Sequence, residues 1–247
     1  MSKILWTNSI LPEEQNPSTL TYDVYPNMQN LEGFAGIPLT DKDITIAEPR
    51  AFRSMSRAAL LLSATCQSVE SHIASYLGKD PFSVGMYAAV ENGPIHVPTT
   101  KEMTNLPEGE FASTYKKLRN PKMYLKQLPN LAPAQTGIFL KIQGPLNVYT
   151  HSTHAGLQAL EQAEFDLIHN NVQAALVCTA FSFEDPLINA RIRRDEPQRT
   201  ISEGAAAILL TNNGDRTNWS DLVRSDSNTY YGISDEIVNL TKKMKGN

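Results

Sequence analysis

The densest group of side chains that could do chemistry lies in residues 151–154. These residues read His151-Ser152-Thr153-His154, so two hydroxyl groups stand between two imidazoles. A hydroxyl becomes a nucleophile when a neighbouring histidine accepts its proton, and such a pair can hydrolyse or transfer acyl groups from thioesters. No acidic side chain lies within a few residues to orient either imidazole. An acyl-thioester hydrolase or acyltransferase using Ser152 or Thr153 with His151 or His154 is therefore kept as an alternative.

The same residues support two less reactive interpretations. Two histidines alone seldom form a zinc site, so no metal is predicted here. A helix dipole contributes about 1 kcal/mol, whereas one pKa unit corresponds to about 1.4 kcal/mol. The dipole cannot ionise a threonine hydroxyl, so we expect Thr153 to act as a helix N-cap. We expect His151, Ser152 and His154 to line a pocket or to be structural.

The cysteines offer no alternative nucleophile. The chain has two, Cys66 and Cys178, and their spacing matches no metal or redox motif. Cys178 stands among Ala, Leu and Val, and Cys66 falls within a predicted helix. Buried cysteines behave as small apolar residues, so both are expected to be inert.

The elements that must position residues 151–154 follow from apolar periodicity. A strand at 146–150 leads into them, and a helix at 154–169 follows. The pattern predicts further strands at 3–8, 84–90, 174–181 and 205–211, and further helices at 55–77, 110–118, 128–142 and from Ser234 to Lys245. Residues 12–49 show little periodicity and are expected to form a long excursion. Alternating strands and helices predict one α/β domain, residues 1–247, with a largely parallel sheet.

Composition excludes several classes of function. The chain has 247 residues, a formal net charge of −4 and 41% hydrophobic residues, which is ordinary for a globular protein. The net charge offers no field to attract nucleic acid. No apolar run approaches the roughly 18 residues of a membrane helix, so no membrane association is predicted. We expect a cytoplasmic protein without a cofactor.

Several segments together resemble the β-ketoacyl synthase (ketosynthase) family. The run from Gly144 to Gly156 resembles that family's nucleophile turn, with Thr153 at the position of its reactive cysteine by spacing from Gly144-Pro145 and Ala159-Leu160. Four other segments are similar to the family in the same order, namely Ile4 to Pro12, Arg53 to Arg57, Leu128 to Gln135 and Ser202 to Ala207. The resemblance covers nearly the whole chain but only the amino-terminal half of the family.

The resemblance implies a fold and a non-catalytic role. It implies a thiolase-like half-fold, in which helices cover both faces of a mostly parallel mixed sheet. The family's second half, which supplies two catalytic histidines and a lysine, has no counterpart in this sequence. The type that the chain is most similar to is the short chain-length-factor-like subunit of aryl polyene biosynthesis. Such a subunit pairs with an active ketosynthase and shapes its acyl tunnel.

The resemblance also assigns roles to residues. Met123 and Tyr124 would gate the tunnel, and Glu203 and Gly204 would be structural. The dimer interface would contain Asn130, Leu131, Gln135, Leu146, Asn147, Val148, Tyr149 and Thr150. An acidic acyl carrier protein could be steered by the basic residues Lys116, Lys117, Arg119, Lys122 and Lys126. A carrier-protein docking module that needs no ketosynthase is a second alternative.

Overall fold

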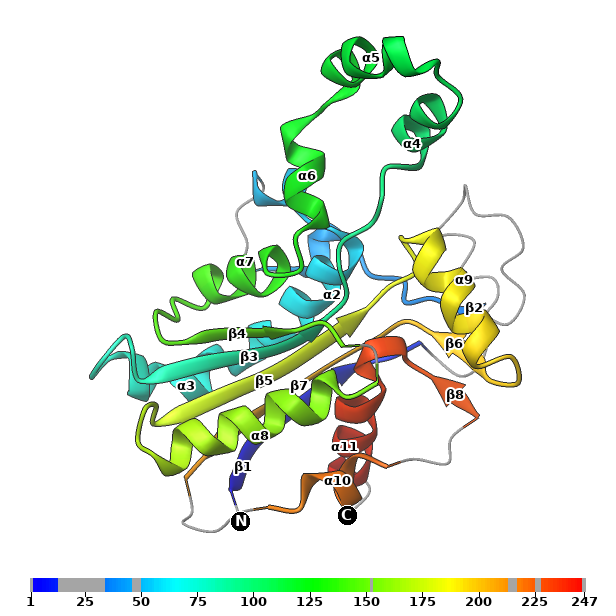
Figure 1. Cartoon of the computed structure of the whole chain (residues 1–247). Helices are drawn as coiled ribbons and strands as arrows, with labels where there is room; N and C mark the ends of the chain where they lie inside the picture. The colour runs from blue at the N-terminus through cyan, green and yellow to red at the C-terminus, as the bar shows by residue number, and fades with distance from the viewer. Residues whose placement is uncertain are drawn as a thin grey trace.

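The computed structural model describes residues 2–12, 34–45, 50–151, 153–212, 217–224 and 228–245, apart from the side chains of Glu108 and Met123 (Figure 1). The strands are β1 (Lys3–Ile10), β2 (Phe34–Ala35), β3 (Val84–Val90), β4 (Leu146–Tyr149), β5 (Ala174–Phe181), β6 (Thr200–Ser202), β7 (Gly204–Thr211) and β8 (Thr229–Tyr230). The α-helices are α2 (Arg57–Cys66), α3 (Glu70–Leu77), α4 (Val97–Thr104), α5 (Phe111–Leu118), α6 (Pro121–Gln127), α7 (Leu131–Phe139), α8 (Ala155–Ile168), α9 (Pro186–Asp195), α10 (Trp219–Val223) and α11 (Asp235–Lys245). The short 3-10 turns are η1 (Asp41–Asp43), η2 (Ala51–Ser54), η3 (Gln67–Val69), η4 (Glu108–Glu110) and η5 (Gly232–Ser234).

The main sheet has five strands in the order β1-β7-β5-β3-β4. Strand β5 pairs parallel with β3, and β3 pairs parallel with β4. Strand β7 pairs antiparallel with both β5 and β1, so only β7 is reversed. The prediction of a mostly parallel mixed sheet is therefore confirmed. A smaller parallel sheet, β2-β6-β8, lies beside it.

The three central strands are apolar on both faces, which is why their sequences read as continuous hydrophobic runs. Strand β3 illustrates this, because Met86 and Ala88 contribute to the core on one face while Tyr87 contributes to the core on the other. Helices α2 and α7 pack on the first face, and α8, α10 and α11 pack on the second (Figure 1). The result is three layers, helices–sheet–helices, with the sheet in the middle.

Some predicted helices are divided or shortened. The helix expected at 55–77 is two helices, α2 and α3, separated by η3. At this break the Gln67 side chain bonds the backbone of Thr45 and Asp43. The helix expected at 128–142 is the shorter α7, and Lys141 with φ 60° stands just beyond its end. Within the long excursion, β2 and η1 are ordered, while residues 13–33 and 46–49 lie outside the described part.

Four short helices, α4, α6, α9 and α10, were missed, although two of them carry recognisable starts. Asn120 and Asp185 each precede a proline and accept a hydrogen bond from a backbone N–H two residues on, at Lys122 and Leu187. An N-cap side chain followed by proline is a known helix start. The helices α6 and α9 are too short and polar for periodicity to reveal them. The N-cap of α4 is His96, whose Nδ1 accepts the Thr99 N–H.

The segment between β3 and α7 forms an arm, defined here as residues 94–127, which carries α4, α5 and α6 away from the layers (Figure 1). Its two ends are joined by a hydrogen bond from Gly93 N–H to the Gln127 carbonyl oxygen (3.0 Å). A Cβ at position 93 would lie 1.5 Å from the Lys126 carbonyl oxygen, so only glycine permits this approach. The base of the arm is therefore closed tightly against itself.

None of the described helices is both long enough and apolar enough to cross a bilayer.

Candidate functional site

The turn before α8 places the hydroxyl and imidazole groups at the surface. The Thr153 Oγ1 lies 3.1 Å from His151 Nδ1, and both side chains are exposed. The residue at the N-cap of α8 is His154, and its side chain makes no capping bond. The prediction that Thr153 is the N-cap is therefore wrong, because the helix begins one residue later and the threonine hydroxyl turns back to His151. Ser152 lies outside the described residues.

The N-terminus of α8 is capped by a carboxylate from the last helix. Glu236, in the first turn of α11, accepts the Leu157 N–H at Oε2 (2.7 Å). The contact is possible because residue 156 is glycine, where a Cβ would lie 2.9 Å from that oxygen. Burial raises the pKa of Glu236, and the Leu157 N–H and His154 oppose the shift. A negative charge here complements the positive end of the helix dipole.

The structure thus supplies an acid, Glu236, that the sequence around residues 151–154 lacks. This acid contacts His154, and not the histidine that contacts Thr153. Glu236 Oε1 lies 3.6 Å from His154 Nδ1, whereas Thr153 contacts His151. The two imidazole rings are nearly parallel, with centroids 6.1 Å apart. The Thr153–His151 pair and the His154–Glu236 pair are separate. Among the described residues, no chain of contacts runs from Glu236 through one histidine to the Thr153 hydroxyl, as a nucleophile–base–acid triad requires.

The crevice at the carboxyl ends of the parallel strands is nearly filled. In α/β proteins with open sheets, ligands usually bind at this edge. Here the space between the strand ends and the base of the arm is about 20 Å³, lined by Val90, Gly93, Pro129 and Phe181 among others. That volume suits about one water molecule. It does not suit an acyl chain.

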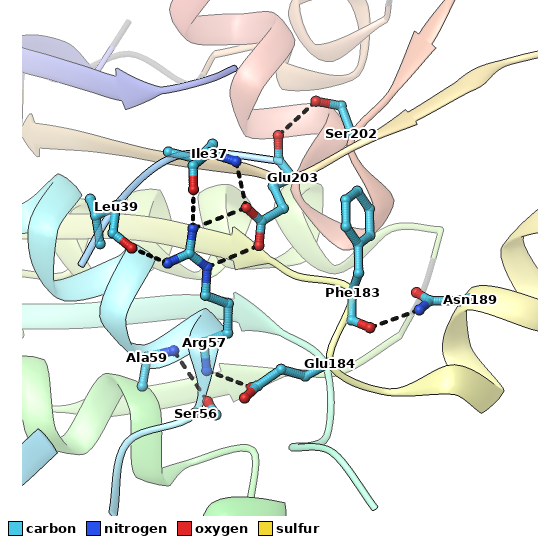
Figure 2. Close-up of polar contacts among 10 residues, drawn as sticks. All are labelled: Ile37, Leu39, Ser56, Arg57, Ala59, Phe183, Glu184, Asn189, Ser202 and Glu203. Atoms are coloured by element: carbon cyan, nitrogen blue, oxygen red, sulfur yellow. Dashed lines mark hydrogen bonds and ion pairs between the residues drawn. The ribbon is translucent and has the colours of Figure 1, made fainter. Parts of the chain in front are cut away.

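Glu203 lies at the centre of a buried polar network at the same end of the sheet (Figure 2). Its Oε2 accepts the Ile37 N–H (2.7 Å), and its Oε1 accepts the Arg57 Nε–H (3.1 Å). The Arg57 guanidinium also donates to the carbonyl oxygens of Ile37 and Leu39. Glu203 is fully buried and Arg57 is 8% exposed. The network ties the 34–39 segment to α2 and to the start of β7, where Gly204 is the first residue.

The strand that enters the turn, β4, lies at the edge of the sheet (Figure 1). In its register with β3, Met86 N–H donates to the Pro145 carbonyl oxygen, so the N–H groups of Asn147 and Tyr149 face β3. The N–H groups of Leu146 and Val148 consequently face outward, where no described strand pairs with them.

The residues assigned to an interface differ in exposure. Leu146, Thr150 and Asn130 are exposed, whereas Asn147, Val148, Tyr149, Leu131 and Gln135 are half-buried. The Gln135 Nε2–H donates to Ser54 Oγ (3.0 Å), so this amide faces η2.

Seven of the exposed large apolar side chains in the described chain lie on the arm, on the connection to α7, on α7 and on β4. We call this set the apolar face; it comprises Phe111, Tyr115, Tyr124, Leu125, Leu128, Ile138 and Leu146. Ile138 is 72% exposed, an unusual exposure for an isoleucine. Concentrated apolar exposure of this kind commonly marks a protein–protein or ligand-binding surface.

Tyr124, one of the two predicted tunnel residues, lines a hollow of about 350 Å³ between α4, α5 and α6. Its ring meets Tyr115 edge-on at 6.3 Å between centroids, and Tyr115 stacks on Phe111. Met123 lies on the same helix, but its side chain is outside the described part.

The basic residues assigned to a carrier protein all lie on the arm. Lys116, Lys117, Arg119 and Lys122 are exposed, and Lys126 is half-buried. By contrast, Arg191 on α9 pairs with Glu91 (2.7 Å) and Arg194 with Asp195 (2.9 Å). Within the described chain, no group of three or more His, Cys, Asp or Glu side chains is arranged to hold a metal ion.

Known structures share this fold. No family model and no curated protein matches the sequence. One similar structure is AntDE:AntF, a type II polyketide acyl-carrier protein in complex with its ketosynthase. The matched chain is 15% identical to the present protein with a TM-score of 0.62. The match covers 86% of the present protein and 63% of the matched chain. A β-ketoacyl synthase from Burkholderia phymatum is 16% identical with a TM-score of 0.53, and 83% of this chain covers 52% of it.

A third similar structure contains a ketosynthase, ApeO, in complex with its chain length factor, ApeC, from Xenorhabdus doucetiae. The identity is 15% and the TM-score 0.52, and 85% of this chain covers 79% of the matched chain. The chain thus spans about half to two thirds of the first two matched chains and a larger share of the third. The predicted thiolase-like α/β fold of ketosynthases is confirmed.

Proposed function

We propose that this chain is a non-catalytic ketosynthase-like subunit of the chain-length-factor type. It pairs with an active β-ketoacyl-acyl-carrier-protein synthase and shapes that partner's acyl tunnel, in the polyketide- or fatty-acid-type synthesis that makes aryl polyenes. The observation that carries the proposal is the open edge of β4 bordered by the apolar face. Proteins normally cover or blunt such an edge, because it readily pairs with another strand.

The pairing would extend the sheet from one subunit into the other. The outward N–H groups of Leu146 and Val148 would bond a strand of the partner, while Leu146 and Ile138 would bury apolar surface against it. The arm would then reach over the partner. Tyr124, with Met123 beside it in the sequence, would lie where a growing acyl chain ends. The complex of ApeO with ApeC is a known pairing of this kind in a protein of similar fold.

The turn before α8 supports the non-catalytic part of the proposal. A condensing enzyme needs a nucleophile whose pKa is lowered at a helix N-terminus, and donors that stabilise an oxyanion. Here Thr153 holds the relevant position, and Glu236 already accepts the Leu157 N–H at that helix end. A carboxylate at this place opposes any second developing negative charge.

The proposal is tested by co-expressing the chain with a ketosynthase from the same organism and measuring the mass of the purified complex by size-exclusion chromatography with light scattering. A stable 1:1 complex is expected. Tyr124→Ala and Met123→Ala should lengthen the product measured by mass spectrometry, since each removes volume at the tunnel end. Separate elution of the two chains at micromolar concentration would contradict the proposal.

The hydrolase alternative is kept because Thr153 Oγ1 does contact an imidazole. It predicts that the isolated chain, using Ser152 or Thr153, hydrolyses acyl thioesters and that His151→Ala or His154→Ala abolishes this activity, according to which imidazole is the base. For the Thr153–His151 pair we expect no such activity, because the acid contacts His154 and not His151.

A further inference from the structure

The outer side of α8 carries a stripe of exposed side chains beside β4. The buried face of this helix packs against β3, β4 and β5 (Figure 1). Exposed residues recur along its other side at spacings of three or four, which places them on one line. They are His154, Gln158, Glu161, Phe165 and His169. The stripe thus presents an amide, a carboxylate and an aromatic ring to solvent, between two histidines.

Two hollows meet on this side of the helix, and Glu161 and Phe165 line both of them. The larger one, about 390 Å³, lies between α8 and β4, and we call it the α8–β4 hollow. It is lined by Tyr149, Gln158, Glu161, Gln162 and Phe165. The His169 ring lies against Phe165, with 4.0 Å between centroids, and its Nδ1–H donates to the Phe165 carbonyl oxygen (2.8 Å). This histidine therefore holds the phenyl ring at the border of the hollow.

The charge around the α8–β4 hollow is negative. Within the described chain, Glu161 takes part in no ion pair and no side-chain hydrogen bond. Two more carboxylates of α8, Glu164 and Asp166, are buried, and the hydrogen bonds they accept come from neutral hydroxyl and amide groups. Burial raises the pKa of Tyr149, and the Asp166 carboxylate raises it further. The phenol therefore stays protonated, and the hollow favours a cation.

The lining suits an organic cation, and a guanidinium above others. A cation is attracted to the face of an aromatic ring and to a carboxylate. The guanidinium is planar, stacks on aromatic rings and carries five N–H donors, whereas an ammonium carries three. The acceptors of the hollow make no other side-chain hydrogen bond within the described chain. They are the Glu161 carboxylate, the amide oxygens of Gln158 and Gln162, and the Tyr149 hydroxyl.

We propose that the α8–β4 hollow binds the guanidinium group of an arginine on the partner subunit. Tyr149 belongs to β4, the edge strand, and packs on the α8 side of the sheet. Side chains of a strand that paired with β4 would lie about 5 Å from those of β4 on the same face. A long cationic side chain there would reach the hollow and complement its charge. This choice of occupant rests on the proposed function, whereas the cation site stands on the lining residues themselves.

The cation site is tested on the isolated full chain with two probes of the same shape. N-acetylarginine amide carries the guanidinium, and N-acetylcitrulline amide replaces it with an uncharged urea. We expect the arginine probe alone to shift the side-chain amide NMR signals of Gln158 and Gln162 in a saturable way. The binding should weaken as salt rises, because the contact with Glu161 is electrostatic.

Variants of the lining separate the two contributions. Glu161→Gln should weaken binding of the arginine probe by about tenfold, the usual effect of losing one charged hydrogen bond. Phe165→Leu should weaken it by about threefold, as expected for an exposed cation–π contact. Glu70→Gln is the matched control, because this glutamate is also exposed but lies on α3, which packs on the other face of the sheet. It should change the affinity by less than about twofold.

The occupant is tested with the separately purified ketosynthase by surface plasmon resonance. Glu161→Gln should weaken the complex by about tenfold or more, because the partner's arginine would be left buried without its carboxylate. Glu161→Arg should weaken it further through like-charge repulsion. Glu70→Gln should leave the affinity unchanged.

Other outcomes would overturn the inference. Equal shifts by the arginine and citrulline probes would remove the cation site, and an equal loss in Glu70→Gln would reduce it to general surface charge. An unchanged affinity of Glu161→Gln for the ketosynthase would exclude the partner's arginine. Tighter binding of spermidine than of the arginine probe would then identify a free polyamine as the occupant.

The result can be separated from the fate of the proposed function. If the isolated chain binds the arginine probe through Glu161 but forms no complex, the proposed partner is wrong and the cation site stands. If the complex forms, the arginine probe does not bind and Glu161→Gln assembles normally, only this inference is wrong.

Discussion

Two regions at the same end of the main sheet differ in whether their polar side chains are buried and paired or exposed. Glu203 stands just before β7 and the 150–154 turn just after β4, and the registers bring these strand ends to one edge. Around Glu203 the charged groups are buried and paired (Figure 2). In the turn, the His151, Thr153 and His154 side chains are exposed and meet in separate pairs.

The difference shows where this fold requires a fixed geometry. A buried charge must be paired, because an unpaired one costs several kcal/mol. The Arg57–Glu203 pair therefore fixes the path of the chain at this edge. The exposed turn carries no such constraint, and its helix end is occupied by Glu236. The geometry of the chain is therefore held more firmly around Glu203 than in the turn, a difference that the proposed partner role predicts.

The largest expected effect comes from breaking the buried pair. Arg57→Met leaves the Glu203 carboxylate buried without its guanidinium partner, and we expect a loss of about 3–5 kcal/mol in the free energy of unfolding. Urea denaturation followed by circular dichroism measures it. Arg194→Gln is the control, because its pair with Asp195 is exposed, and it should not change the midpoint. A loss below about 1 kcal/mol in Arg57→Met would contradict the view that this pair anchors the edge.

The next effect is on assembly and leaves the fold unchanged. Ile138→Asp and Leu146→Asp place charges on the apolar face, where side chains are already solvent-exposed in the single chain. Burying an unpaired carboxylate against a partner is costly, so we expect the complex to weaken by about a hundredfold or more. Leu187→Asp is the matched control, since this leucine is 65% exposed but lies on α9. Equal weakening by all three would move the interface away from β4.

The sequence predicts the layers of this molecule better than it predicts contacts between distant segments. Strands β3, β5 and β7 are continuous apolar runs, so their type and bounds follow from composition alone. The arm helices are short and polar, and their positions depend on the closure at Gly93. The cap of α8 could not be predicted locally, because Glu236 comes from the last helix. Only the bare position at Gly156 hints that another element approaches there.

A smaller effect tests that cap through its pH dependence. Burial raises the pKa of Glu236, so the folded chain binds this proton more tightly than the unfolded chain does. Its contribution to stability is then greatest below the ordinary glutamate pKa and falls as pH rises through the raised folded value. Glu236→Gln should remove this slope in thermal unfolding between about pH 4 and pH 7. An unchanged slope would show that the carboxyl is not held in this environment.

The smallest effect is expected at Thr153 itself. Thr153→Ala in the co-expressed complex should leave condensation unchanged, because the hydroxyl's hydrogen-bond partner among the described residues is His151. Thr153→Cys restores a thiol, and its rate of alkylation by iodoacetamide against pH reports the thiol pKa. We expect that pKa near or above the ordinary cysteine value of about 8.5, since the Glu236 carboxylate offsets the helix dipole. Adding Glu236→Gln should lower it by less than about one unit. Cys66 and Cys178 are buried, so they add little background. A thiol pKa well below 8.5 in the single variant would mean that the turn can still activate a nucleophile. The turn would then lack a nucleophile only because residue 153 is a threonine, and not because of its geometry.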